Sequence, residues 1–224
     1  MNFSDIDAKA AAFYLQIYGG FTAGSSDTAL PPDTKSLLLL GPKEPGFWPY
    51  VSAEPEFLDG QSNPLDRWSR RAIDTLASDC AAQSLFPFGG PPWLPFTSWA
   101  LRTGRCWVSP IQFLVHDMAG LMVSFRGALA IPYRIKLPRP PLSAPPCASC
   151  QDKPCITACP ANALDDDHYD SQACIDYTGS PAGHDCLMRG CAVRRICPVS
   201  MKFPRREAQS HFHQKALINS PNPP

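Results

Sequence analysis

The spacing of apolar residues along the first part of the chain predicts both helices and strands. The clearest helix covers residues 63–82, where Asn63 suits the N-cap and Pro64 the first helical position. Its apolar face repeats every three or four residues, through Leu65, Trp68, Ala72, Leu76 and Cys80. Because Cys80 belongs to this face, we expect it to be a buried core residue.

Three further stretches have the pattern of regular elements. Residues 4–17 are predicted to form a helix capped by Ser4. The apolar run "SLLLLG" at 36–41 predicts a short buried strand. Residues 111–132 are predicted to form two strands joined by a turn at residues 118–120. Strands interspersed with helices in this way favour an α+β layer.

Prolines and cysteines divide the chain. Of the ten cysteines, all but Cys80 and Cys106 lie after the Pro-rich stretch "LPRPPLSAPP" at 137–146. The aromatic stretch at 86–100 is either a lid over a flat ligand or a loop packed on the core. The last residues, "NSPNPP", are predicted to be disordered. This distribution predicts an α+β domain at 1–140, a cysteine-rich domain at 141–210 and a tail at 211–224.

Charge and hydropathy exclude some classes of protein. The 20 basic and 20 acidic residues balance, so nothing points to nucleic acid or an anionic membrane as a partner. No apolar run approaches the roughly 18 residues of a membrane span, and an acidic N-terminus argues against a secretory signal. We therefore expect a cytoplasmic protein. There, many cysteines favour metal ligation over the disulfides of a secreted module.

The first cysteine motif is "CASCQDKPCITACP", residues 147–160, with the spacing C-x2-C-x4-C-x3-C-P. Four thiolates at this spacing suit either tetrahedral zinc or an iron–sulfur cluster. The Cys-Pro ending favours iron–sulfur, because two-cluster bacterial ferredoxins end a similar run in this way and use its fourth cysteine in the other cluster. Zinc and purely structural thiols stay as alternatives.

A second run of cysteines supplies the ligands for a second cluster. "CLMRGC" at 186–191 repeats the x4 spacing, and "CPVS" at 197–200 repeats the Cys-Pro ending. Crossing the fourth ligands predicts two [4Fe-4S] clusters. The first would be held by Cys147, Cys150, Cys155 and Cys197, and the second by Cys159, Cys174, Cys186 and Cys191. For Cys174, a buried free thiol is the alternative.

Basic residues gather around this second run: Arg189, Arg194, Arg195, Lys202, Arg205 and Arg206. Positive charge near a cluster favours its reduced state and raises its potential. The same charge could dock an acidic redox donor protein. The alternative is a solvated face without a role.

The cysteine-rich part, residues 145–200, resembles the dicluster ferredoxin domain of epoxyqueuosine reductases and corrinoid-dependent reductive dehalogenases. "CPANAL" is similar to their "CPTGAI", "CIDY" to "CISY", and "GCAVRRICP" to "GCDVCQEVCP". Arg194 stands where that last motif has a cysteine, and Cys186 could replace this ligand from upstream. The resemblance implies two [4Fe-4S] clusters.

The N-terminal part resembles the cobalamin-processing cblC-type family. "FLVHDMAGLMVSFRGALAIP" at 113–132 is similar to that family's hairpin, with His116, Gly120, Arg126 and Gly127 matching. The resemblance implies a nitroreductase-like α+β fold that holds a corrinoid or a flavin, with His116, Arg126 and Gly127 as candidate cofactor-binding residues. Arg126 could bind an acidic group of the ligand or form a structural salt bridge.

Together these resemblances imply an iron–sulfur redox protein. It would relay electrons from a redox donor protein to a corrinoid, as an iron–sulfur-dependent corrinoid reductase. Three alternatives stay open: an electron-transfer protein without its own substrate, a tRNA-modifying enzyme like the epoxyqueuosine reductases, and a structural zinc module.

Overall fold

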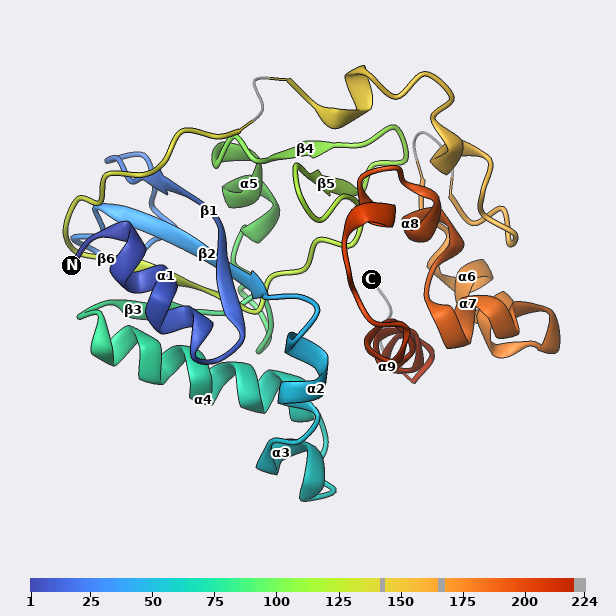
Figure 1. Ribbon diagram of the computed structural model, residues 1–224, viewed down its shortest axis with the longest axis horizontal. Helices are drawn as coiled ribbons and strands as arrows, with labels where there is room; N and C mark the ends of the chain where they lie inside the picture. Colours follow the sequence, from blue (N-terminus) through green and yellow to red (C-terminus); the bar gives the residue numbers. More distant parts are fainter. Residues whose placement is uncertain (142–143, 165–167, 220–224) are drawn as a thin grey trace. The chain divides into compact units, whose positions relative to one another are not determined.

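The computed structural model describes residues 1–141, 144–164 and 168–219. It is a mixed α and β structure with small antiparallel sheets (Figure 1). Contacts divide the chain into two compact units, each built from two segments. The sheet unit comprises Met1–Arg105 and Ser124–Pro141, and the cysteine unit comprises Cys106–Val123 and Leu142–Pro224. Residues 106–123 thus group with the cysteine-rich part, although they precede the Pro-rich stretch.

The sheet unit contains a four-stranded antiparallel sheet in the order β1-β2-β6-β3. Its strands are β1 (Leu15–Thr22), β2 (Ser36–Pro42), β6 (Gly127–Ile131) and β3 (Gln83–Leu85). The predicted strand at 36–41 is confirmed. All seven residues of β2 are buried, because β1 and β6 pair with its two edges and the apolar run fills both faces.

Helix α4 (Pro64–Asp79) lies along this sheet and contacts β3 and β6 (Figure 1). It confirms the predicted helix, with Pro64 in its first turn. Its apolar residues are buried, and Cys80 at the C-terminal end is 1% exposed, as expected for a core residue. Asn63 precedes the helix, but its backbone is left-handed and its side chain makes no capping hydrogen bond.

The predicted helix at 4–17 is wrong in its cap and its length. Helix α1 spans Phe3–Ala11, and Asn2, not Ser4, caps it through a reciprocal pair of hydrogen bonds with Asp5. Tyr14 has a left-handed backbone with φ of 51°, which ends the helical path. The residues after Tyr14 form β1 instead, because they pair with β2 along its whole length.

The remaining helices of the sheet unit are short. They are α2 (Phe47–Val51), α3 (Pro55–Leu58) and α5 (Phe96–Arg102). Helix α5 begins inside the aromatic stretch at 86–100, where Phe96 and Trp99 are buried while Trp93 is 66% exposed. The stretch is therefore divided between a core helix and an exposed loop.

The two strands predicted within 111–132 exist, but they do not pair with each other. β5 (Leu114–His116) pairs with β4 (Cys106–Val108), and β6 pairs with β2 and β3. The predicted hairpin is therefore wrong. Both edges of β6 are already occupied, so no edge remains for β5.

Besides β4 and β5, the cysteine unit is built from mostly short helices, of which the 3-10 helices η1, η2 and η3 begin at a proline. They are η1 (Pro146–Ala148), η2 (Pro154–Ile156), α6 (Ser171–Gly179), η3 (Pro181–Gly183), α7 (His184–Arg189), α8 (Ala192–Ile196), η4 (Ser200–Lys202) and α9 (Glu207–Ile218). Its small core combines apolar side chains with thiols: Ile111, Val115, Leu121, Cys155, Leu164, Val193 and Cys197. The predicted disordered end lies, apart from Asn219, outside the described residues.

No helix in the described part of the chain is long and apolar enough to cross a membrane.

Candidate metal centres

Four cysteines of the cysteine unit line one cavity of about 40 Å³, called here the first site: Cys147, Cys150, Cys155 and Cys197. Short one-turn helices place two of them, since Cys147 lies on η1 and Cys155 on η2. Cys197 follows α8 as its C-cap residue. The other walls are mostly apolar and include Val115 and Leu121.

Four other cysteines line a second cavity of about 340 Å³, called here the second site: Cys159, Cys174, Cys186 and Cys191. Cys174 lies on α6 and Cys186 on α7, and Cys191 is the N-cap residue of α8. The backbone N–H of Ala163 donates to Cys159 Sγ at 3.3 Å. Aromatic rings, including Phe113 and Tyr169, form part of the wall.

The structure thus brings the eight cysteines together in the two groups that the crossed assignment predicts. Cys155 and Cys159 are four positions apart but line different cavities, and so do Cys191 and Cys197 at the two ends of α8. Cys174 lines the second cavity with its predicted partners. Its role as a ligand stays a prediction.

Within the described residues, no three His, Cys, Asp or Glu side chains gather closely enough to hold a single metal ion. The thiols of each site instead stand around a cavity.

Burial changes the acidity of several of these thiols. It raises the pKa of Cys147, and the neighbouring thiols of Cys155, Cys197 and Cys150 add to this effect. Burial and Cys197 likewise raise the pKa of Cys155. Since a thiol must lose its proton to bind a metal, loading the first site would release protons.

The same effect operates at the second site. Burial raises the pKa of Cys186 and Cys191. At Cys191 the positive charge of Arg194 and the N–H groups of Arg194 and Val193 oppose it. The second site therefore already offers positive charge and hydrogen-bond donors to one of its sulfurs.

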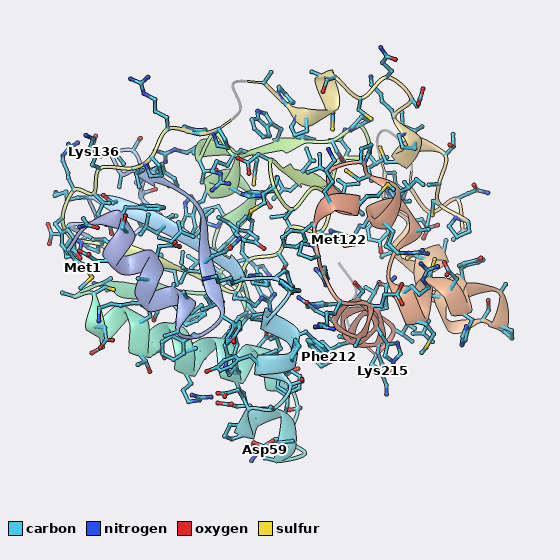
Figure 2. The ribbon with its side chains drawn as sticks, viewed as in Figure 1. Met1, Asp59, Met122, Lys136, Phe212 and Lys215 are labelled. Atoms are coloured by element: carbon cyan, nitrogen blue, oxygen red, sulfur yellow. The ribbon has the colours of Figure 1, made fainter. Side chains whose placement is uncertain are left out.

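The arginines of the basic group have different partners. Arg189 Nε donates to Glu207 at 2.7 Å, and Arg195 forms an ion pair with Asp185. Arg205 Nη1 donates to the carbonyl oxygen of Met122, which Figure 2 labels, at 3.1 Å. Arg189 and Arg195 are therefore neutralised by nearby carboxylates.

His116, a predicted cofactor-binding residue, is fully buried in the cysteine unit. Its Nδ1 accepts the backbone N–H groups of Met118 and Ala119, each at 3.2 Å. The same Nδ1 also lies 3.2 Å from an Asp117 oxygen. These contacts shape the turn after β5.

Arg126 and Gly127, the other two predicted cofactor-binding residues, lie in the sheet unit. The Arg126 side chain is 12% exposed and lies 3.7 Å from an Asp66 oxygen, and its Nε has no hydrogen-bond partner among the described residues. Burial lowers its pKa, which the Asp66 charge opposes. A Cβ on Gly127 would lie 2.7 Å from Ile73 Cδ1, so this glycine allows α4 to approach β6.

The sequence pattern did not single out the β4–β5 hairpin or Tyr169. Val115 on β5 lines the first cavity, and Tyr169 lines the second. A signal for the hairpin existed, since "CWV" and "FLVH" are β-rich runs separated by a short Pro-containing segment. No equivalent local pattern marks Tyr169.

Comparison of the chain with protein-family models, with characterised proteins and with solved structures gave no significant match. The resemblances to dicluster and cobalamin-processing proteins therefore rest on the motifs alone.

Proposed function

We propose that the protein is an iron–sulfur redox protein that carries two [4Fe-4S] clusters, one in each cysteine-lined cavity. One observation carries this proposal. Eight cysteines surround two separate cavities, four around each, in the crossed arrangement of a dicluster ferredoxin. On this proposal the cysteine unit is a ferredoxin-like dicluster module.

The residues at both cavities fit such clusters. Each cavity offers four soft thiol ligands, which iron–sulfur clusters require. Bound clusters would accept and release single electrons. Val193 is fully buried and packs in the core with ligands of the first site, while it also lines the second cavity. Val193 therefore contributes an apolar side chain to the surroundings of both sites.

The electron donor and acceptor are proposed from the motifs and from one observation in the sheet unit. A redox donor protein would supply electrons, and a corrinoid, with a flavin as alternative, would receive them on a nitroreductase-like sheet unit. The side chain of Arg126 favours an anionic ligand. Its guanidinium is largely buried, its Nε has no hydrogen-bond partner in the described part of the chain, and the nearest Asp66 oxygen is 3.7 Å away. The protein would then act as a corrinoid reductase.

Anaerobic purification tests the cluster proposal. We expect brown protein with about eight iron and eight acid-labile sulfide atoms for two [4Fe-4S] clusters. Reduction should produce a cluster signal in electron paramagnetic resonance. Protein with zinc and no sulfide would overturn the proposal, and four irons would remove one of the two clusters.

Hydroxocobalamin tests the proposed acceptor. Protein with intact clusters should bind it and change its visible spectrum when a chemical reductant is added. Arg126→Gln should weaken binding at least tenfold, whereas Arg134→Gln, at an exposed position of the same unit, should not. Unchanged spectra at saturating ligand would exclude a corrinoid and leave the cluster proposal intact.

A further inference from the structure

Arg194 supplies a positive charge to the second site. It lines the second cavity, and its guanidinium carbon lies 4.7 Å from the centre of the Phe113 ring. Its Nη1 donates to the carbonyl oxygen of Leu121 at 2.5 Å. Both contacts fix a partly buried side chain beside the thiols. Across the described ranges, no carboxylate forms an ion pair with Arg194.

The next residue shows the contrasting arrangement. Arg195 also lies on α8, but it donates to the carbonyl oxygen of Gly190 at 3.0 Å and forms an ion pair with Asp185. The Asp185 carboxylate opposes its charge. Arg194 and Arg195 are neighbours on α8, and neither is a proposed cluster ligand. Among the described residues, only Arg195 of the two forms an ion pair with a carboxylate.

The first cavity has a weaker electrostatic counterpart. Lys153 lines it, but Lys153 is exposed, so water and salt screen its charge. A partly buried arginine without an ion pair among the described residues acts on a nearby site more strongly than an exposed lysine does. The two sites therefore differ in the positive charge that each experiences.

Tyr169 adds a hydrogen-bond donor to the second site. Its ring packs edge-on against Phe113, with centroids 5.7 Å apart, and its hydroxyl hydrogen-bonds to the Cys174 thiol. Phe113 thus holds both Arg194 and Tyr169 at the wall of one cavity.

We propose that Arg194 and Tyr169 give the second site a higher reduction potential than the first. The inference rests on the proposed cluster function. A positive charge and a donor to a ligand sulfur both stabilise the state with one more electron. An electron supplied by the redox donor protein would therefore come to rest at the second site. Arg194, which replaces a cysteine of the family motif, becomes a positioning residue that directs the electron.

Redox titration of the anaerobic holoprotein tests this inference through the potentials of its two cluster signals. The signal that is absent from Cys174→Ala identifies the second site. We expect it to have the higher potential, and Arg194→Gln to lower it by about tenfold in the one-electron equilibrium constant, about 59 mV. Arg194→Lys should keep most of the wild-type value, and Tyr169→Phe should lower the same signal by a smaller amount.

Arg195→Gln is the matched control and should shift the second potential clearly less than Arg194→Gln does, because Asp185 opposes the charge of Arg195. Equal shifts in Arg194→Gln and Arg195→Gln, equal shifts of both signals, or a higher potential at the first site would overturn the inference. If Arg194→Gln does not retain iron, the Tyr169→Phe variant tests the proposal instead. An unchanged potential of the second site in Tyr169→Phe would then contradict the proposal. Wild-type protein without clusters would instead refute the proposed function itself.

Discussion

Gly120 packs closely on the segment that follows the first-site residue Cys197. Its φ is 57°, and a Cβ there would lie 2.5 Å from both the backbone nitrogen and the Oγ of Ser200. Ser200 lies three positions after Cys197, and its Oγ accepts the N–H of Leu121 at 2.8 Å. The turn after β5 therefore packs directly on the loop that carries a first-site cysteine.

Gly120→Ala should displace this loop and weaken the first site. We expect the iron content to fall by about half, and the melting temperature of the cysteine unit to fall as well. Gly60→Ala is the control, because Gly60 also has a positive φ, 72°, but has no atom within 4 Å of a new Cβ. The control carries only the left-handed strain of about 1–2 kcal/mol. Equal losses in both variants would mean that contact with Ser200 is unimportant.

The ion pair of Glu56 and Arg71 is a second feature at the residue scale. Arg71 Nε donates to Glu56 Oε1 at 2.5 Å, and the Glu56 side chain is 11% exposed. Hydrogen bonding to Arg71 lowers the pKa of Glu56, against the opposing effect of burial. Because the pKa of Glu56 is lower in the folded than in the unfolded state, the ionised carboxylate stabilises the fold at pH values above its unfolded pKa. This stabilisation is lost as the pH falls below about 4.3.

Glu56→Gln should therefore reduce the free energy of unfolding by about 1–3 kcal/mol at pH 7. The difference from wild type should shrink as the pH is lowered from about 5 to 3. Urea unfolding at several pH values measures both effects. Asp79→Asn is the control, since its pair with Lys9 is 3.5 Å long and largely exposed, and it should cost less than about 1 kcal/mol. A difference that is independent of pH would contradict the assignment.

At the scale of elements, α8 connects the two sites. Cys191 precedes this five-residue helix and Cys197 follows it, yet they line different cavities. The segment from Cys155 to Cys159 makes the same connection in the first half of the module. Two short segments, residues 155–159 and 191–197, thus join the two sites. Each site therefore takes cysteines from both the first and the second cysteine run.

Single cysteine variants test this crossing. Cys197→Ala and Cys147→Ala should each remove the spectroscopic signal of the first site. Cys191→Ala and Cys174→Ala should each remove the signal of the second site. Cys80→Ala, a core position in the sheet unit, should keep both signals. If Cys191→Ala and Cys197→Ala removed the same signal, the ligands would be uncrossed.

Local pattern predicted some elements well and failed where distant partners decide. β2 and α4 were predictable, because an apolar run and a helical repeat are complete within their own residues. The hairpin at 111–132 was not, because the pairing of β6 depends on β2 and β3, far away in the sequence. Cysteine spacing anticipated both groups of thiols, whereas Tyr169 contacts its site only through the tertiary fold.

At the scale of the whole molecule, the two units differ in what holds them together. The sheet unit has an extensive apolar core around β2 and α4. The core of the cysteine unit is small and includes two of the proposed ligands, Cys155 and Cys197. When ligands form part of the core, the free energy of metal binding contributes to the free energy of folding.

Removing iron with a chelator under anaerobic conditions should therefore loosen the cysteine unit and leave the sheet unit folded. We expect amide hydrogen exchange to accelerate at least tenfold in α7 and α8, while β2 and α4 keep their protection, because their hydrogen bonds and core involve no proposed ligand. Reconstitution with iron and sulfide should restore protection in the cysteine unit. Equal acceleration in β2 and α8 would show that the two units unfold together, and unchanged exchange in α8 would show that the thiols stabilise the fold without a cluster.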